Sequence, residues 1–183
     1  GFPKLPRIAG AEFAAVEAGV RYANRTDVML VRLAPGTTVA GAFTRSSTRA
    51  ACVLDCQGKL AGKPDSASGA AIIVNSGNSN AFTGKVGVAS VEAVTGAVAK
   101  ALGLPAVRVF SSSTGVIGEP MPHDRIVAKL PDLTAALDEG ATKFVEVRVT
   151  GAASAGDARK VGMAIANSPL VKTAIRSEER RVG

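Results

Sequence analysis

AAIIVNSGNSNAFTG, the stretch from Ala70 to Gly84, decides the fold, because an apolar run passes directly into small polar residues. The run AAIIVN is continuous rather than alternating, which fits a strand buried on both faces of a parallel sheet. The Asn, Ser and Gly residues that follow are typical of a turn. We therefore expect a strand at 70–75 whose end carries an Asn-rich turn.

A helix is predicted after this turn, since apolar residues recur at spacings of three and four and share one face: Val88, Val91, Val94, Val98 and Leu102. Gly103 ends the helix as a C-terminal cap, with Pro105 just beyond it. The segment VRVF at 107–110 then predicts a second strand. A strand, a helix and a strand in this order give parallel pairing with a right-handed crossover, so we expect an α/β protein.

Further elements are predicted on both sides of this unit. The branched apolar run DVMLVRL at 27–33 ends at Pro35-Gly36, which indicates a strand joined by a tight turn to another strand at 39–43. A third short strand is expected at 52–54, and a short helix at 124–130.

The last third of the chain continues in the same style. FVEVRV at 144–149 alternates Val with charged residues, which is typical of a strand with one wetted face. A helix is expected over 158–165, and one more helical turn at 172–175.

Composition favours a closely packed globular protein. Of the 183 residues, 46% are hydrophobic, mostly Ala and Val, with no Trp, so small side chains must hold the layers in near contact. No run is long enough to cross a bilayer, and the start GFPKLPRIAG has no cleavage signal, so we expect a cytoplasmic protein. Because the chain begins with Gly rather than Met, we expect its first residues to be missing.

Charge and cysteine content argue against nucleic-acid and metal sites. Despite a net charge of +7, Lys and Arg are scattered singly outside the terminal RSEERRVG, and there is no aromatic set for base stacking. Cys52 and Cys56 with a distant His123 supply too few ligands for zinc. We therefore expect reduced thiols and neither a metal nor a cofactor.

Two stretches carry more small polar residues than a plain loop needs, and each follows a predicted buried strand, where α/β proteins build sites. NSGNSNAFTG at 75–84 is no phosphate loop, because its glycine spacing is wrong and Val86 stands where Ser or Thr would bind magnesium. SSSTGVIG at 111–118 offers backbone N–H groups and a hydroxyl that could hold an oxyanion. Each stretch also fits a plain turn capped by its own side chains. A nucleophile pair of Ser112 and His123 is disfavoured, since no orienting carboxylate is marked.

The same two stretches resemble signatures of the ornithine acetyltransferase family. NSGNSNAFTG is similar to the family's Asn-Ser-Gly-Asn-Ala-Asn-Ala-x-Thr-Gly, and STGVIGEPMP resembles its Ser-Thr-Gly-Val-Ile-Gly stretch, at the expected distance and in the expected order. TVAGAFTRSSTRAACV and ANSPLVKTAI also match family stretches. The resemblance covers most of the chain from Gly1 to Ile175.

The resemblance implies a layered αββα fold, shared with self-processing aminopeptidases, and a chain that cuts itself before a nucleophilic threonine. That threonine would move an acetyl group from N-acetylornithine to glutamate in arginine biosynthesis, with acetyl-CoA as a further donor in bifunctional relatives. The family's oxyanion donors correspond to Thr114 and Gly115, and its substrate-binding glutamate, in DEGATKF, corresponds to Glu139. The resemblance then implies small amino acids as substrates, and it leaves open whether the chain forms a homo-oligomer.

The chain departs from the family where LPDLTAAL passes directly into DEGATKF. Relatives carry a Lys-Gly-x-Gly-Met stretch and an Ala-Thr-Met-Leu cleavage site between these segments, and neither motif occurs in this sequence. The resemblance therefore implies an incomplete fold without the nucleophile segment, and we expect no turnover from this chain alone.

We expect a fragment or an internally deleted form with three parts. Residues 1–137 carry the acetyltransferase-like region with the oxyanion turn, 138–175 resemble the later part of the family, and 176–183 form a foreign-looking charged tail. Two alternatives stay open, a non-catalytic folded remnant that binds a partner and an aminopeptidase-like member of the same fold.

Overall fold

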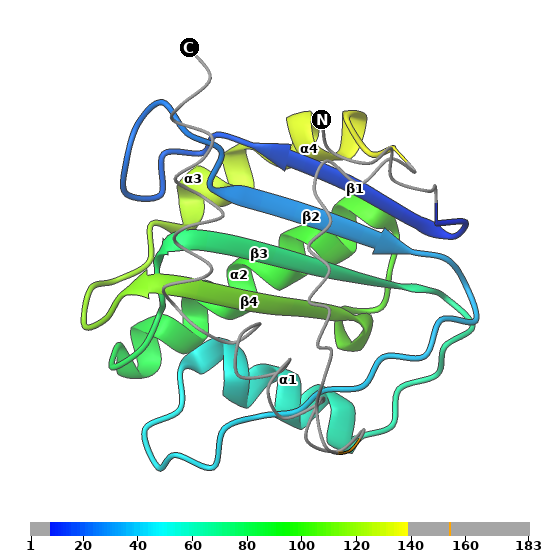
Figure 1. The fold of residues 1–183 in the computed structure, drawn as a ribbon, viewed down its shortest axis with the longest axis horizontal. Helices are drawn as coiled ribbons and strands as arrows, with labels where there is room; N and C mark the ends of the chain where they lie inside the picture. Colours follow the sequence, from blue (N-terminus) through cyan, green and yellow to red (C-terminus); the bar gives the residue numbers. More distant parts are fainter. Residues whose placement is uncertain (1–7, 139–153, 155–183) are drawn as a thin grey trace. The chain divides into compact units, whose positions relative to one another are not determined.

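The computed structural model describes residues 8–138 and 154, and its centre is a four-stranded sheet (Figure 1). The strands lie in chain order, β1 (Ala11–Val16), β2 (Val28–Leu33), β3 (Ala70–Asn78) and β4 (Val109–Val116). β2 pairs antiparallel with both β1 and β3, whereas β3 and β4 run parallel. The predicted α/β class is confirmed. The chain divides into two compact units, 1–142 and 143–183, and all described residues except Ser154 belong to the first.

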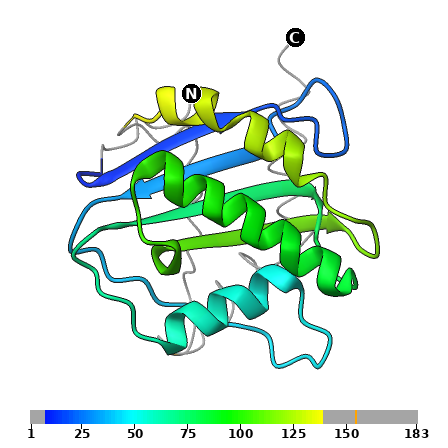
Figure 2. The same cartoon turned by 180° about the vertical axis from the view of Figure 1, so that it is seen from behind.

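The strand-helix-strand unit predicted from the sequence is present. Helix α2 (Gly84–Leu102) connects β3 to β4 and crosses one face of the sheet (Figure 2). Its C-terminal cap is Gly103, whose left-handed backbone (φ 65°) suits glycine, and whose N–H donates to the carbonyl of Ala99. A short 3-10 turn, η1 (Ala106–Arg108), precedes β4, so this strand begins two residues later than predicted.

The main hydrophobic core lies between the sheet and the helices α2, α3 (His123–Ala128) and α4 (Leu130–Ala135). Three of the five residues predicted to share a buried face of α2 are buried: Val91, Val94 and Val98. Val88 is 44% exposed, because the first turns of α2 line an open pocket instead of the core. The sheet and α2 supply the core mainly with Val, Ala, Ile and Leu side chains, as the composition indicated.

Two predicted strands are wrong. The segment 39–43 is not a strand, because β2 already pairs with β1 on one side and β3 on the other and leaves no edge for a hairpin partner. Residues 52–54 belong to helix α1 (Ala51–Ala61). Its buried Cys52 and Cys56 are four residues apart and lie on one face of the helix. The prediction considered only three residues, which is too short a segment to show this helical spacing.

Two other predictions needed adjustment. The helix predicted at 124–130 is in fact two helices, because Pro131 does not end the segment but lies in the first turn of α4, where its missing N–H costs no hydrogen bond. The serines at 111–113, expected to end a strand, continue β4 as far as Val116. β1 was not predicted at all.

Several predictions fall on residues outside the described part of the chain. These are the strand at 144–149, the helix at 158–165 and the turn at 172–175. Among residues 8–138, no helix combines the length and the apolar character needed to cross a membrane.

Candidate functional site

The carboxyl ends of β3 and β4 bring the two polar stretches of the sequence side by side (Figure 1). In the parallel register, Ser76 lies opposite Thr114 and Gly77 opposite Gly115. The ends of neighbouring parallel strands are the usual location of sites in α/β proteins. The structure thus joins NSGNSNAFTG and SSSTGVIG into one region.

The backbones of the two strands touch at Gly77 and Gly115. A register shift follows Gly77, and both glycines have positive φ angles, 102° and 136°. A Cβ atom on Gly115 would lie 2.3 Å from the carbonyl carbon of Gly77 and 2.5 Å from the backbone nitrogen of Asn78. Only glycine therefore fits at position 115 without moving β3.

Asn75 and Ser79 bind the two strand ends to each other. Asn75 is buried, and its Oδ1 accepts a hydrogen bond from the hydroxyl of Ser113 at 2.6 Å. The backbone N–H and the hydroxyl of Ser79 both donate to the carbonyl oxygen of Val116, each at 2.9 Å. These contacts fix the end of β4 against the Asn-rich turn.

Asn78 extends the same attachment beyond β4. Its side chain is 3% exposed, and its Nδ2 donates to the carbonyl oxygens of Glu119 at 3.0 Å and Pro120 at 3.2 Å. Its Oδ1 accepts from the backbone N–H of Asn80 at 2.7 Å. One carboxamide therefore spans the Asn-rich turn and the segment that follows the second motif.

Asn80 organises the start of α2. It is fully buried, and its backbone has a positive φ of 49°. Its Nδ2 donates to the carbonyl of Gly87 at 2.9 Å, and its Oδ1 accepts from the hydroxyl of Thr83 at 2.8 Å. Phe82, also at positive φ, is 67% exposed. The asparagines of the motif are thus engaged within the fold. β3 extends to Asn78, so the first four residues of NSGNSNAFTG lie in the strand and not in a turn, and the turn interpretation fits only the residues between Asn78 and α2.

Thr114 and Gly115 are the exposed part of this arrangement. Within residues 8–138, no hydrogen bond involves the hydroxyl of Thr114. An exposed hydroxyl beside a glycine backbone, near the end of a strand, can donate to a negatively charged oxygen. The oxyanion role suggested by the sequence for 111–118 stays a prediction. Glu139, the predicted substrate-binding residue, lies outside the described residues.

Ser112 and His123 do not form a nucleophile pair. His123 Nδ1 lies 3.1 Å from the hydroxyl oxygen of Ser90, and no hydrogen bond joins His123 to Ser112 in the described part of the chain. Ser90 is fully buried, and its hydroxyl also donates to the carbonyl of Val86 at 3.0 Å. A buried hydroxyl bound to its own helix cannot reach a substrate, so this contact is structural.

The cysteines lie apart from this region, on α1. Both are buried and free, and the Cys56 thiol donates to the carbonyl of Ser111 at 3.3 Å. In residues 8–138, no group of three or more His, Cys, Asp or Glu side chains is placed to hold a metal ion.

Burial raises the pKa of the Cys56 thiol, because the thiolate would lose its hydration. A raised folded-state pKa stabilises the fold below the thiol's ordinary pKa, and this stability is lost as the pH rises through the raised value. We therefore predict that a Cys52→Ala chain, in which Cys56 is the remaining thiol, reacts with iodoacetamide at pH about 8 much more slowly when folded than when unfolded in urea. Equal rates would show that the thiol is accessible.

The loop between β1 and β2 packs beside the strand ends, a contact that no sequence pattern predicted. The buried carboxylate of Asp27 accepts hydrogen bonds from the backbone N–H groups of Ala18 at 2.7 Å and Val20 at 2.6 Å, which shapes the loop. Arg21 then lies against Gly77 and forms an ion pair with Glu119, the residue after SSSTGVIG. Arg21 and Glu119 are 98 positions apart in the sequence, so no local pattern predicts their contact.

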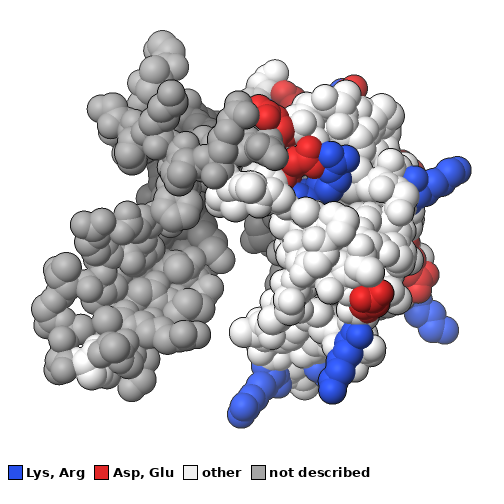
Figure 3. Space-filling view, turned by 90° about the vertical axis from the view of Figure 1, so that its right-hand side faces the viewer, with Lys and Arg blue, Asp and Glu red and all other residues white. Residues whose placement is uncertain are grey.

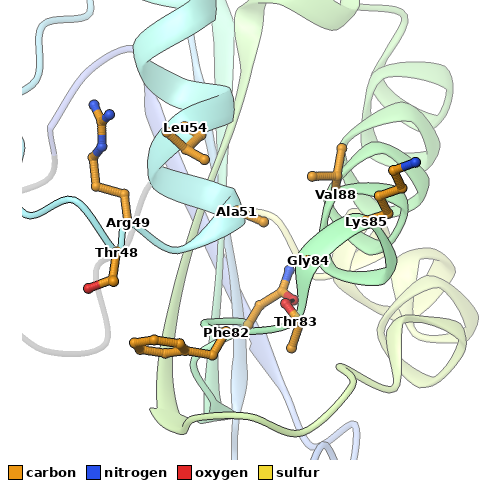
Figure 4. Close-up of a pocket in the computed structure, with 10 residues that line it drawn as sticks. Thr48, Arg49, Ala51, Leu54, Phe82, Thr83, Gly84, Lys85 and Val88 are labelled. Carbon is orange, nitrogen blue, oxygen red and sulfur yellow. Dashed lines mark hydrogen bonds between the residues drawn. The ribbon is translucent and has the colours of Figure 1, made fainter.

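An open pocket of about 360 Å³ adjoins the Asn-rich turn, between the N-terminal ends of α1 and α2 (Figure 4). Leu54, Phe82 and Val88 give it apolar walls, and Arg49 and Lys85 also line it. Asn80 contributes to the lining, whereas Thr114 and Gly115 do not. The pocket therefore lies beside the Asn-rich turn and is not lined by the exposed Thr114-Gly115 pair.

The charged side chains of the described residues form no single basic surface on the face that Figure 3 shows. Figure 3 shows Lys and Arg side chains of the described residues standing apart on the face in view, with Asp and Glu among them. On that face, the positive charge of the chain is dispersed.

The family model of ArgJ matches the chain over residues 12–139 and again over 137–183. The chain belongs to the ArgJ family. The arginine biosynthesis bifunctional protein ArgJ of Ruegeria pomeroyi is 58% identical over 164 residues, and that of Gluconobacter oxydans is 44% identical over 137 residues. These matches cover 88% and 75% of this chain, but only 40% and 31% of the two relatives. The chain thus spans about two fifths of the length of the first relative.

Solved structures of ArgJ proteins share the fold. Ornithine acetyltransferase from Mycobacterium tuberculosis, solved in complex with ornithine, matches with a TM-score of 0.66 and 34% identity over 72% of this chain and 69% of that chain. The ArgJ protein of Bacillus halodurans matches with a TM-score of 0.60 and 30% identity, over 66% of this chain and 61% of that chain. The predicted family and its fold are confirmed, and this chain is a partial ArgJ region.

Proposed function

We propose that this chain is part of a cytoplasmic acetyltransferase of arginine biosynthesis that moves an acetyl group from N-acetylornithine to glutamate through an acyl-threonine. The observation that supports this best is the exposed Thr114-Gly115 pair near the end of β4, beside the end of β3, in a chain of the ArgJ family. The substrates are small amino acids, and acetyl-CoA is a further acetyl donor. No metal or cofactor takes part in this proposal.

The chemistry assigns a simple role to the turn. When a threonine oxygen attacks the acetyl carbonyl carbon, the threonine proton passes to a nearby amine base and the carbonyl electron pair moves onto oxygen. The Thr114 hydroxyl and the Gly115 N–H donate to that oxygen. The C–N bond then breaks, ornithine leaves with the proton on its amine, and the amine of glutamate attacks the resulting ester. Each such donor is worth on the order of 100-fold to 1000-fold in rate.

The nucleophile is the part that this chain lacks. The family matches meet at residues 137–139, which supports an internal junction at the place where the sequence departs from the family. Asp138 pairs with Phe13 of β1 through two backbone hydrogen bonds, so the chain reaches the sheet just before Glu139. We propose that Glu139 contacts the amine of ornithine, and that the chain alone has no turnover because it has no attacking threonine.

Binding of N-acetylornithine to the full chain tests this assignment without turnover. In a titration followed by two-dimensional NMR of the backbone amides, we predict saturable shifts at Thr114 and Gly115. A Thr114→Val chain keeps the shape of the exposed side chain but loses the hydroxyl donor, so it should bind more weakly. Thr37→Val is a matched control, because that hydroxyl donates within a turn to the carbonyl of Ala34. Saturable shifts confined to other regions would favour the folded remnant that binds elsewhere.

A further inference from the structure

The side-chain carboxamide of Asn78 forms hydrogen bonds with two different segments of the chain. The oxygen binds within the motif, to the N–H of Asn80, and the nitrogen binds two carbonyls of the other segment, at Glu119 and Pro120. A flipped carboxamide would set two donors against each other at Asn80 and an oxygen against both carbonyls. The surrounding backbone therefore fixes the orientation of this side chain.

The carbonyls bound by Asn78 belong to the segment 116–120, which follows the exposed Thr114 and Gly115 of β4. At the other end, Ser79 holds the carbonyl of Val116, and between the two the N–H of Gly118 donates to the carbonyl of Ala81 at 2.8 Å. The segment 116–120 is thus attached to the Asn-rich motif at three successive points. Asn78 supplies the last of them, and it is the one that depends entirely on a side chain.

Other residue types would not reproduce this attachment. Aspartate would keep the acceptor for Asn80 but would place a carboxylate against two carbonyl oxygens. Serine is too short to reach Glu119 and Pro120, and the side chain is only 3% exposed, which leaves little room for glutamine. Glu119 and Pro120 are themselves exposed, so without Asn78 their carbonyls can turn to water and the turn can open without unfolding the core.

We propose that Asn78 is a positioning residue, which holds the 116–120 segment so that the Thr114 hydroxyl and the Gly115 N–H face one acyl oxygen. The role in acyl transfer rests on the proposed function, whereas the positioning itself does not. Asn80 is the natural comparison, because its carboxamide has the same two-sided bonding but connects the motif to α2 at Thr83 and Gly87.

The test compares Asn78→Asp and Asn80→Asp in the full chain by two-dimensional NMR without ligand. Both variants keep an acceptor and lose a buried donor, so a general loss of stability should be similar. We expect Asn78→Asp to shift or broaden the amide signals of Thr114 and Gly115, while Asn80→Asp changes signals around 83–90. Asn78→Ser has a side chain too short to reach the carbonyls of Glu119 and Pro120, and it adds no charge. If Asn78→Asp does not fold, Asn78→Ser is compared with Asn80→Asp in its place.

The positioning role is overturned if Asn78→Asp and Asn78→Ser leave the Thr114 and Gly115 signals in place, or if Asn80→Asp moves them equally. Adding N-acetylornithine separates this result from the proposed function. If N-acetylornithine shifts no signal in the unmodified chain, the oxyanion assignment is contradicted. The comparison of the variants without ligand still decides the role of Asn78. Weaker ligand shifts in Asn78→Asp than in Asn80→Asp support both.

Discussion

Replacing Gly115 with alanine is expected to lower the free energy of unfolding by about 3 kcal/mol or more, and to displace the end of β4 from β3. The added Cβ would overlap the backbone of Gly77 and Asn78, which cannot rotate away as a side chain could. The φ angle of 136° adds strain, because residues with a Cβ rarely adopt it. Urea unfolding followed by circular dichroism measures the loss.

Gly96→Ala is the matched control for this substitution. Gly96 lies on an exposed position of α2, and a Cβ there would meet no atom within 4 Å. Alanine should therefore stabilise the helix by about 0.5 to 1 kcal/mol. A Gly115→Ala chain as stable as the unmodified protein would show that the two strand ends are not in close contact, and would remove the basis for a fixed turn at Thr114.

The central unit of the fold could be predicted because its signals are local and long. The continuous apolar run specifies β3. The helical repeat over the nineteen residues of α2, ended by a glycine cap, specifies the helix. Neither signal needs tertiary information, and the return strand follows from both. The segment 52–54 shows the opposite case. Read as three residues it looked like a strand, whereas the helix becomes visible only when Cys56 and Lys59 are included, the latter paired with Asp55 four residues earlier at 2.8 Å.

The sequence placed the candidate site at the strand ends, where it stays a prediction, but it did not indicate what the motif's side chains bind. Serine, threonine and glycine at a strand end indicated donors for an oxyanion, and Thr114 and Gly115 are indeed exposed there. Besides their local bonds, Asn75 and Asn78 bind groups that lie 38 to 42 residues further along the chain. Sequence alone left these asparagines as generic turn residues, because their role depends on the parallel pairing of β3 with β4.

The largest expected effect on activity follows from our proposal that this chain has no nucleophile. An oxyanion site stabilises the charge that an attack creates, but it forms no bond to the substrate, so donors without a nucleophile cannot produce an acyl-enzyme. In a serine protease, loss of the nucleophile costs on the order of 10⁶-fold in rate. We therefore expect no detectable transfer of acetyl from N-acetylornithine to glutamate by this chain, even though its Thr114-Gly115 turn is in place.

Growth of an arginine-requiring strain that lacks its own acetyltransferase tests this account most directly. The Ruegeria pomeroyi ArgJ protein serves as the positive control, and an empty vector as the negative control. We predict that the present chain, expressed in soluble form at a comparable level, supports no more growth than the empty vector. Robust growth on the chain alone would contradict the account, because the described site would then need a nucleophile that we have not recognised.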